Sequence, residues 1–454
     1  MIGPARIAVY EILQAISTGS SDLPGAIAAT RARLHDDRDR ALTSEIAIGV
    51  ERWRGALDHL IVEFSGRRLD RLDAEVVDIL RLSIYQLLHL TRVPAAAVVD
   101  DAVDLTRKAG KRSAAGLVNA VLRAVSRGRS HLPLPARPTG TSDRAQALAY
   151  LSVTLSHPEW IAARWLDRFG FETAEAWMQF NNSPAPLTLR VNRLRLSPEE
   201  LIGRLSRAGV RVRRGAFAPD ALIVEEGSPL RAQGADTGWF AVQDEASQLA
   251  ALLASPAPGA RVLDTCASPG GKTTALAAAL DGRGLVVACD VRERRVQLLA
   301  RTVAASGARN VRLVRADFLR PAPFHACFDV VVVDAPCSGL GTLRRDPDIR
   351  WRRHETDLTA LAAAELAMLQ HAAEAVVPGG RLIYITCSSE PEENEGVADL
   401  FASSMSRFVA LDAHTVSPRL AAAGVIDERG RLRTEPHRHG LEAFFGAVFE
   451  NRGL

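Results

Sequence analysis

The sequence predicts a multidomain protein made of an all-α helical bundle, a small α+β unit and a larger α/β domain. Three observations predict it: apolar residues recur at helical spacing through the first 128 residues, a proline-rich stretch without periodicity follows, and strands alternate with helices from about residue 241. We expect the bundle at 1–128, a linker at 129–145, the small α+β unit at 146–240 and the α/β domain at 241–454.

The composition is that of an ordinary folded protein. The 454 residues are enough for about three domains, and 24% charged with 47% hydrophobic residues is typical of globular chains. No apolar run approaches the roughly 20 residues that a membrane helix needs, and the first residues lack the pattern of a signal peptide. All five cysteines follow residue 260, which does not indicate a disulfide framework. We therefore expect a protein of the reducing cytoplasm with no membrane partner.

Helical spacing of apolar residues predicts the N-terminal bundle. Two stripes show it most clearly, each suited to face a core. They are Ala5, Val9, Ile12, Leu13 and Ile16, and further on Val76, Ile79, Leu80, Ile84, Leu87 and Leu88. The region shows no glycine-rich phosphate loop, metal-ligand spacing or nucleophile pattern, so we interpret it as a binding or docking module.

The small α+β unit is predicted from mixed patterns after the linker. Helical stretches at 159–169 and 198–208 alternate with short strand-like runs at 187–191 and 221–224. The linker itself, 129–145, is rich in proline, glycine and small polar residues.

Regular alternation of strands and helices predicts the α/β domain. Strand candidates are 261–264, 284–289, 311–315, 329–333 and 381–386, helical stretches are 273–280, 293–305 and 358–375, and 443–449 is a candidate edge strand. Such alternation is typical of a mainly parallel, doubly wound sheet with helices on both faces. Ligands of such sheets bind beyond the carboxyl ends of the strands.

Basic residues gather in three stretches, although the net charge is only +3. Residues 107–129 hold seven Lys and Arg and no acid, 190–214 hold eight Arg against two Glu, and 344–353 hold five Arg around Trp351. Arg-rich patches with an aromatic side chain fit phosphate binding and base stacking. A solvated helix face would give the same pattern at any one stretch.

A glycine loop follows the first predicted strand, in Asp264-Thr265-Cys266-Ala267-Ser268-Pro269-Gly270-Gly271-Lys272-Thr273. Asp290 follows the second strand, about twenty residues beyond the glycines, where an acid accepts hydrogen bonds from ribose hydroxyls. Asp317 follows the third and could receive an adenine amino group. The loop lacks the G-x-G-x-x-G turn of a dinucleotide site, and a P-loop would need Gly where Cys266 stands. S-adenosylmethionine fits this pocket better, and a generic domain with helix-capping acids is the alternative.

Two cysteines end later strands and open onto the same pocket, in Asp334-Ala335-Pro336-Cys337 and Thr386-Cys387-Ser388. The C5 carbon of cytosine is a poor nucleophile, but thiolate attack at C6 makes C5 enamine-like and able to take a methyl group. This chemistry needs a nucleophilic cysteine, a partner for the N3/N4 edge of the base and help with elimination. Asp334 can supply the second, and the two cysteines can supply the others. The residues alone do not say which cysteine is the nucleophile.

The other cysteines and the histidines do not indicate chemistry of their own. Cys266, Cys289 and Cys327 fit the packing of small apolar side chains. Eleven histidines show no metal-ligand spacing, and His437-Arg438-His439 suits the surface or an RNA contact better than a ligand site. We expect no bound metal.

These motifs together resemble bacterial RNA cytosine-C5 methyltransferases of the Sun/Fmu type, which act on small-subunit ribosomal RNA. The strongest marks are 264–273, 334–339 and Thr386-Cys387-Ser388 followed by Glu392-Glu393-Asn394-Glu395, with support from Leu189-Arg190-Val191-Asn192 and residues 242–247. The helical region is similar to the RNA-binding antitermination factor NusB, through Tyr85-Gln86-Leu87-Leu88 and residues 116–123.

The resemblance implies a NusB-like bundle and a Rossmann-like, S-adenosylmethionine-dependent methyltransferase domain. It assigns the nucleophile to Cys387 and product release to Cys337. Asp334 is the third catalytic residue that we expect, as the partner for the N3/N4 edge of the base. The resemblance also implies a set of cofactor-binding positions. They are Cys266, Ala267, Ser268, Pro269, Gly270, Gly271, Lys272, Asp290, Arg295, Asp317 and Asp334.

The leading hypothesis is a cytoplasmic, monomeric enzyme that forms 5-methylcytosine in 16S rRNA with S-adenosylmethionine as cofactor. The same reaction on tRNA is an alternative, because the catalytic motifs do not distinguish the two RNAs. A non-catalytic RNA-binding or antitermination factor is another. Intact Cys337, Cys387, Asp334 and the glycine loop argue against it.

Overall fold

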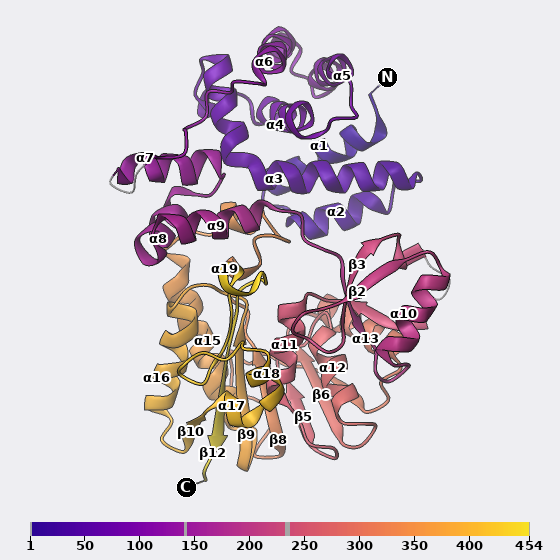
Figure 1. Cartoon of the computed structure of the whole chain (residues 1–454), viewed down its shortest axis with the longest axis vertical. Helices are drawn as coiled ribbons and strands as arrows, with labels where there is room; N and C mark the ends of the chain where they lie inside the picture. The colour runs from indigo at the N-terminus through magenta and orange to yellow at the C-terminus, as the bar shows by residue number, and fades with distance from the viewer. Residues whose placement is uncertain (1, 140–142, 232–236, 454) are drawn as a thin grey trace. The chain divides into compact units, whose positions relative to one another are not determined.

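The computed structural model describes residues 2–139, 143–231 and 237–453 (Figure 1). They form two compact units. The helical unit comprises the chain up to Pro184 together with Leu343–Glu355. The sheet unit comprises Ala185–Thr342 together with the chain from Thr356 onward. Among the described residues, no helix combines the length and the apolar character needed to cross a membrane.

The helical unit begins with a bundle whose apolar faces meet in one core. Its helices are α1 (Pro4–Ser17), α2 (Leu23–Arg31), α3 (Asp37–Ser65), α4 (Ala74–His89), α5 (Ala95–Lys108) and α6 (Ala115–Gly128). The predicted stripes lie on α1 and α4, where Val9 and Leu13 share a buried cluster with Ile79 and Leu80. The long α3 ends at Gly66, whose left-handed φ of 63° a glycine adopts without strain. The all-α prediction for this region is confirmed.

Three further helices belong to the same unit: α7 (Arg144–Ala149), α8 (Glu159–Phe169) and α9 (Phe171–Asn182). Their core contains Trp165 and Trp177, with ring centroids 5.1 Å apart. The Ser156 hydroxyl accepts a hydrogen bond from the backbone N–H of Gly55 in α3 at 2.7 Å, which fixes these helices to the bundle. Residues 146–184 therefore group with the bundle and not with the small sheet. The domain limits at 128, 145 and 240 stay predictions.

The helical unit also holds an excursion of the chain, Leu343–Glu355, with the short helix α14 (Ile349–Arg352). The Arg350 side chain is fully buried and donates to the Ser156 carbonyl and to Asn182 Oδ1, both at 3.0 Å. The Trp351 indole N–H donates to the Glu51 carbonyl at 2.7 Å. The sequence grouped Arg350 and Trp351 in a basic patch for nucleic acid. That interpretation is wrong for Arg350, because its guanidinium is used inside the protein.

The sheet unit starts with a four-stranded antiparallel sheet in the order β2-β3-β1-β4. The strands are β1 (Thr188–Val191), β2 (Arg211–Arg214), β3 (Ala221–Glu226) and β4 (Phe240–Val242), and α10 (Pro198–Arg207) follows β1. Helix α10 has a capping box, in which Ser197 and Glu200 satisfy each other's backbone N–H groups. Leu201 and Leu205 of α10 pack against Leu189 and Leu222 of the sheet.

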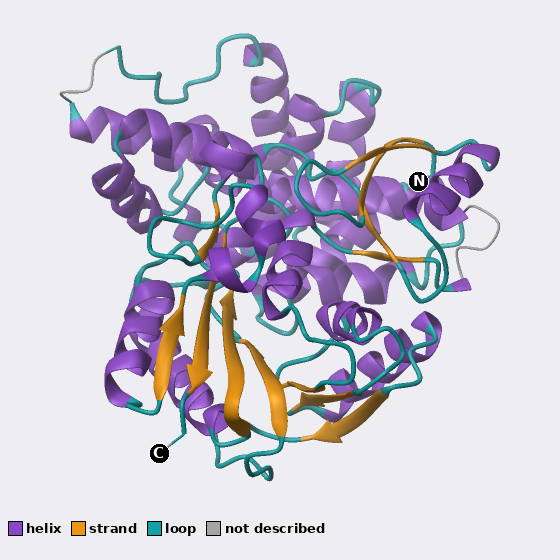
Figure 2. Ribbon diagram, turned by 60° about the horizontal axis from the view of Figure 1, so that its bottom comes forward, coloured by secondary structure: helices purple, strands orange, loops and turns teal. Residues whose placement is uncertain are grey.

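The larger sheet has the strand order β10-β12-β9-β8-β5-β6-β7, with β11 paired to β12, and its strands lie side by side in Figure 2. Its bounds are β5 (Arg261–Asp264), β6 (Leu285–Asp290), β7 (Val311–Arg315), β8 (Phe328–Asp334), β9 (Val376–Thr386), β10 (Phe408–Leu411), β11 (Leu432–Thr434) and β12 (Phe444–Asn451). Strands β5 to β9 pair in parallel, whereas β12 pairs antiparallel to β9. The predicted α/β domain and a strand near 443–449 are confirmed, but the prediction of an edge position is wrong, because β12 lies between β9 and β10.

Helices cover both faces of this sheet, as the near-continuous apolar strands require. Val330 and Val332 of β8 join one buried cluster with Leu276 of α12 (Gly271–Ala279), α11 (Glu245–Ala254) and α13 (Glu293–Ser306). Val331 and Val333 join the other with α15 (Asp357–Ala373) and α16 (Val397–Ser404). Alternate residues of β8 thus point to opposite faces of the sheet, and burial on both faces fixes the register of this strand.

The bundle offers a matched pair of substitutions that tests its packing. A Cβ atom at Gly49 in α3 would lie 2.0 Å from the Tyr85 ring, whereas nothing lies within 4 Å of one at Gly116 in α6. Gly49→Ala should lower the free energy of unfolding by about 1–3 kcal/mol through overpacking. Gly116→Ala should leave it unchanged or raise it by up to about 1 kcal/mol, because alanine favours the helix. Hydrogen exchange of the α3 and α4 amides measures both, and equal effects would contradict this packing.

Candidate active site

The carboxyl ends of four parallel strands bring the predicted site residues to one edge of the larger sheet. Strands β5, β6 and β8 end at Asp264, Asp290 and Asp334, and β9 ends at Thr386, directly before Cys387. The register pairs Asp264 with Ala288 of β6 and with Val332 of β8, and it pairs Asp334 with Ile385 of β9. Residues far apart in sequence therefore meet where such sheets bind their ligands.

The glycine loop runs from β5 into α12 around a buried acid. Thr273 Oγ1 donates to Asp264 Oδ2 at 2.7 Å. Burial raises the pKa of Asp264 to about 7, although the Thr273 hydrogen bond opposes that shift. Asp264 Oδ1 is buried and has no hydrogen-bond partner within the described part of the chain. At Gly270, with φ 107°, a Cβ would approach Leu299 and Thr302 of α13 to 3.0 Å, so the loop needs glycine there.

Asp290 anchors the middle of the glycine loop. Its carboxylate accepts from the backbone N–H of Ser268 at 3.3 Å and pairs with Arg295 Nε at 3.1 Å. Arg295 also donates to the Ser268 carbonyl at 3.0 Å. Asp317, two residues beyond β7, accepts from the Leu319 N–H at 3.0 Å and keeps 38% of its side chain exposed. The two acids thus lie at or just beyond the ends of adjacent strands. Each carboxylate can accept further hydrogen bonds.

The two strand-end thiols lie in contact. Cys337 Sγ and Cys387 Sγ are 3.4 Å apart, although the residues are 50 positions apart in sequence. Cys337 is buried and Cys387 is half-buried. The hydrogen bond to Cys387, followed by burial and the charge of Cys387, raises the pKa of Cys337 well above its ordinary value. The raised pKa favours the protonated form of Cys337, and either thiol can be the donor in the contact between the two sulfurs.

Lys272 places a positive charge between the glycine loop and the thiols. Lys272 Nζ lies 2.6 Å from Asp334 Oδ2, and only 12% of the lysine side chain is exposed. Burial alone would lower the pKa of Lys272, but the Asp334 carboxylate and the charge of Cys387 raise it overall. The ammonium group therefore stays charged and stabilises anions on both sides. The sequence named Lys272 and Asp334 separately and did not predict that they pair.

The remaining cysteines lie in the packed interior or at its margin. Burial raises the pKa of Cys289 to about 12, and burial likewise raises the pKa of Cys266 strongly. Both, with Cys327, pack in or against the apolar cluster on the α15 side of the sheet. Within the described residues, no group of three or more His, Cys, Asp or Glu is placed to hold a metal ion.

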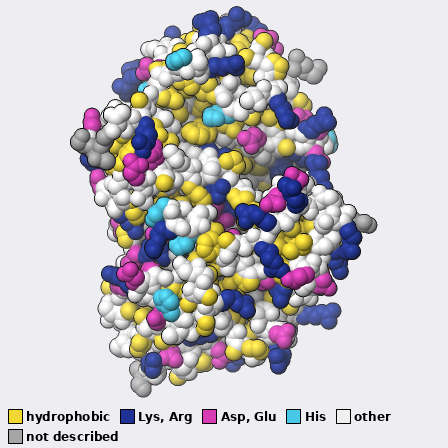
Figure 3. Space-filling view, in the orientation of Figure 1, with side chains coloured by type: hydrophobic (Ala, Val, Ile, Leu, Met, Phe, Trp, Pro, Cys, Tyr) yellow, Lys and Arg dark blue, Asp and Glu magenta, His cyan; other side chains and the backbone are white. Residues whose placement is uncertain are grey.

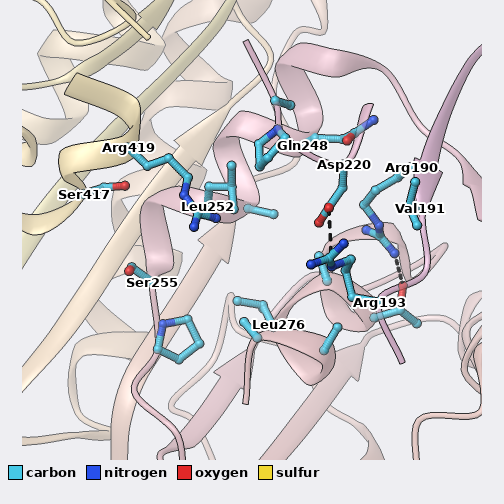
Figure 4. Close-up of a pocket in the computed structure, with 18 of the residues that line it drawn as sticks. Arg190, Val191, Arg193, Asp220, Gln248, Leu252, Ser255, Leu276, Ser417 and Arg419 are labelled. Carbon is cyan, nitrogen blue, oxygen red and sulfur yellow. Dashed lines mark hydrogen bonds and ion pairs between the residues drawn. The ribbon is translucent and has the colours of Figure 1, made fainter. Parts of the chain in front are cut away.

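Arg190 in β1 is a site residue for which the sequence indicated no role beyond membership of the basic stretch 190–214 and of the motif Leu189-Arg190-Val191-Asn192. It is buried and donates to Gln243 Oε1 and Thr274 Oγ1, both at 2.6 Å, and to the Gly271 carbonyl. The small sheet is thereby tied to the glycine loop. Figure 4 shows Arg190 beside a cavity of about 580 Å³, where Asp220 and Arg193 lie 3.7 Å apart. Neither thiol lines this cavity.

Glu393 is a second residue that the sequence marked without a role. It lies in the short π-helical turn Glu392–Gly396 and is fully buried beside Ser338 and Ser388, the residues that follow the two cysteines. Runs of acidic residues such as Glu392-Glu393-Asn394-Glu395 usually lie on the surface. The sequence therefore gives no sign that Glu393, alone of these glutamates, is fully buried.

Two of the basic stretches are partly neutralised within the fold. In 190–214, Arg211 pairs with Glu225 at 3.3 Å and with Glu226 at 2.7 Å, and Arg190 is buried. In 107–129, Lys111 lies 3.3 Å from Glu75. Figure 3 likewise shows Lys and Arg side chains beside Asp and Glu side chains on the face that it draws. The predicted patches are thus less uniformly positive than their sequences indicate.

Comparisons with known proteins match all three parts of the chain. A family model described as 16S rRNA methyltransferase RsmB/F matches residues 251–450. The NusB family matches residues 4–127, and the ferredoxin-like domain of RsmF/B-like methyltransferases matches residues 157–231. The predicted order of a NusB-like bundle, a small α+β unit and a Rossmann-like methyltransferase domain is confirmed.

Relatives and solved structures resemble the chain over most of its length. The probable ribosomal RNA small subunit methyltransferase B of Bacillus subtilis is 31% identical, over 92% of this chain and 92% of that protein. The ribosomal RNA small subunit methyltransferase B of Pseudomonas putida is 35% identical, over 87% and 88%. The crystal structure of PH0851 superposes with a TM-score of 0.78 at 25% identity and covers 99% of both chains.

These similarities agree with the resemblance expected from the strand-end cysteines and the glycine loop. The structure brings those motifs together at one sheet edge, and the relatives cover the bundle, the small sheet and the larger sheet alike. The chain belongs to the family of ribosomal RNA small subunit methyltransferases B.

Proposed function

We propose that this chain transfers a methyl group from S-adenosylmethionine to C5 of a cytosine in 16S rRNA, through a covalent bond between Cys387 and C6. The observation that carries the proposal is the contact of the two strand-end thiols, 3.4 Å apart. Two thiols beside a Lys–Asp pair suit addition to a pyrimidine ring and its reversal. The small-subunit ribosomal RNA named for the relatives supports the choice of substrate.

The residues at the sheet edge fit S-adenosylmethionine. Asp264 Oδ1 is a buried hydrogen-bond acceptor without a donor among the described residues, and an ammonium group could supply that donor. Asp290 and Asp317 follow the next two strands, where carboxylates suit ribose hydroxyls and an adenine amino group. We propose that these acids hold the cofactor together with the loop from Cys266 to Lys272 and with Arg295. When bound, the cofactor supplies an electrophilic methyl group.

In the first step, we infer that the Cys387 thiol gives up its proton to water and its sulfur attacks C6, which forms the C–S bond and breaks the C5–C6 π bond. The negative charge on Cys387 is stabilised by the S–H group of Cys337 and by the Lys272 ammonium group. Asp334, held by Lys272 at 2.6 Å, would position the N3/N4 edge of the base. The electron pair displaced from the C5–C6 bond makes C5 nucleophilic, and C5 would take the methyl group from the cofactor, which would leave as the neutral thioether S-adenosylhomocysteine.

In the second step, the C5 proton must leave so that the C5–C6 double bond re-forms and the Cys387 sulfur is expelled. We propose that Cys337 accepts this proton. Its raised pKa comes first from the hydrogen bond to Cys387. That cause vanishes once the Cys387 sulfur is bound to carbon, because a thioether carries no negative charge. Cys337 would then lose its own proton to water, and its thiolate would take the C5 proton while Cys387 leaves as a thiolate, so that one proton is released in each turnover.

The substrate is tested by methyl transfer from labelled S-adenosylmethionine to purified, unmodified 16S rRNA and tRNA, with the modified base identified. 5-Methylcytosine in 16S rRNA is the expected product. Label in tRNA alone would keep the chemistry and overturn the substrate. No label in either RNA or in a small-subunit particle would favour an RNA-binding factor. The expected monomer and cytoplasmic location stay predictions beside this one.

Cys387→Ala should abolish methyl transfer while RNA binding survives, because the variant lacks the sulfur that we propose bonds to C6. Single-turnover transfer measures the first property and a filter-binding titration measures the second. Cys327→Ala is the matched control, since Cys327 lies away from both strand-end thiols and should leave turnover unchanged. Retained turnover in Cys387→Ala would reject Cys387 as the nucleophile.

Cys337→Ala should trap the protein–RNA adduct, because the Cys387 sulfur can still attack C6 but the C5 proton lacks its acceptor. Denaturing gel electrophoresis should show a band of protein joined to RNA that depends on S-adenosylmethionine. The double variant Cys337→Ala/Cys387→Ala should lack that band. A single variant that releases methylated RNA at the native rate would exclude Cys337 from product release.

A further inference from the structure

Glu393 binds both of the residues that follow the strand-end cysteines. Its side chain is 0% exposed. Oε1 accepts from the Ser338 backbone N–H at 2.6 Å, and Oε2 accepts from the Ser338 hydroxyl at 2.6 Å and from the Ser388 hydroxyl. The two hydroxyls are themselves 3.1 Å apart. One carboxylate therefore joins two loops that are 50 residues apart in sequence.

Glu393 with Ser338 and Ser388 forms a clamp that holds the chain directly beside each sulfur. Ser338 adjoins Cys337 and Ser388 adjoins Cys387, so a shift of either serine moves the neighbouring Cα atom. The Cys387 carbonyl accepts from the Gly341 N–H at 2.9 Å, which adds a second tie between the same loops. Asn394, next to Glu393, donates to the Ser388 carbonyl at 3.0 Å. Both loops are thus fixed by the turn that carries Glu393.

A carboxylate is required at this position by the count of donors. Three N–H and O–H groups point at the two oxygens of Glu393, and a carboxylate accepts at both. An amide would place its own N–H₂ group against one of these donors and leave that donor unpaired in the interior. Burial of a charged group is costly unless such partners are present. Here three partners are neutral groups of the two catalytic loops, and the neutral Glu365 carboxyl is a further hydrogen-bonding neighbour.

A neighbouring buried acid provides a contrast. Glu365 in α15 accepts from the Tyr384 hydroxyl at 2.8 Å, and burial, followed by the charges of Cys337 and Glu393, raises the pKa of Glu365 to about 10. Glu365 is therefore neutral at pH 7. The same Tyr384 hydroxyl lies 2.6 Å from the Glu393 carbonyl, so its single proton is shared between the two acceptors. Two buried glutamates thus lie beside one tyrosine, and only Glu393 joins the cysteine loops.

We propose that Glu393 is a positioning residue that sets the separation of Cys337 Sγ and Cys387 Sγ, and that it thereby controls the rates of adduct formation and release. The proposal rests on the methyl-transfer function proposed above. It extends that function, because Glu393 acts through the serines and touches neither the base nor the cofactor.

The test compares Glu393→Gln and Glu393→Asp with the native chain and with Glu365→Gln, whose amide imitates a carboxyl group that is already neutral. In Glu393→Gln, kcat for RNA methylation should fall by about tenfold or more, as expected for one buried hydrogen bond lost in the reacting geometry. KM for RNA should change by less than about twofold. Glu393→Asp should recover part of kcat, and Glu365→Gln should keep the native kcat.

A second readout needs neither RNA nor cofactor. Diamide oxidises two neighbouring thiols to a disulfide and is itself reduced to a hydrazine, and peptide mapping reports the Cys337–Cys387 disulfide. Thiols in contact should join rapidly in the native chain and about tenfold more slowly in Glu393→Gln, because a loosened pair meets less often. Failure of the native chain to methylate RNA would reject the proposed function but leave this rate measurable.

Two outcomes would overturn the proposal. The first is a Glu393→Gln variant with native kcat and native oxidation rate. The second is a variant in which only KM for RNA rises. If Glu393→Gln does not fold, as judged by its thermal unfolding midpoint, Ser388→Ala removes one donor and keeps the carboxylate. It should slow both rates in the same direction, and native rates in that variant would count equally against the clamp.

Discussion

The parallel pairing of β8 with β9 is the constraint on which the site depends. Its register sets Asp334 opposite Ile385, so the chain that leaves β8 and the chain that leaves β9 bring Cys337 and Cys387 into contact. A slip of one residue would turn the apolar side chains of a strand to the opposite face. The two apolar layers on either side of the sheet forbid that slip, since alternate valines of β8 belong to different layers. Core packing thereby determines catalytic geometry.

Near the ends of β8 and β9, the fold buries charged and polar groups, and such burial would be unfavourable if the groups lacked partners. Lys272, Asp334, Cys387 and Glu393 all lie within or beside the interior. Each has a partner in another loop, so that the ammonium group faces a carboxylate and Glu393 faces neutral donors. Buried polar networks of this kind restrict the conformations of the groups that they join. The same contacts that lower the cost of burial also hold the reacting groups still.

The sequence predicted the fold and the candidate site to different depths. Strand ends carry their polar residues at recognisable places, so pattern alone indicated Asp290, Asp334 and the two cysteines as candidate site residues. It did not indicate a role for Asp264, whose buried and unpartnered Oδ1 only the structure reveals. Tertiary partners leave no such pattern. Arg350 lies in a run of arginines, and its acceptors Asn182 and Ser156 are 168 and 194 residues away. Composition could not separate this buried arginine from exposed ones.

The first residue of strand β9 also differs from the one predicted from the sequence. Strand β9 begins at Val376, five residues before the expected 381, because Pro378, Gly379 and Gly380 read as a loop in the sequence. Pairing with β8 begins at Phe328 opposite Val376, and the register shifts before Val330. Residues 377–380 have no partner in β8 and bulge out of the ladder, where Gly379 takes a positive φ of 78°, so local preference is obeyed and the strand continues around the bulge.

The excursion Leu343–Glu355 has a consequence for how such a protein can evolve. The chain leaves the sheet unit a few residues after Cys337, buries Arg350 among helices built from the first 184 residues, and returns to begin α15. A gene rearrangement that exchanged the N-terminal region for another would take away the acceptors of Arg350 and leave a guanidinium group without its partners. The two regions are therefore not interchangeable parts joined end to end. Neither region can be replaced without changing the other, because the helical unit contains a segment that lies in sequence between two parts of the sheet unit.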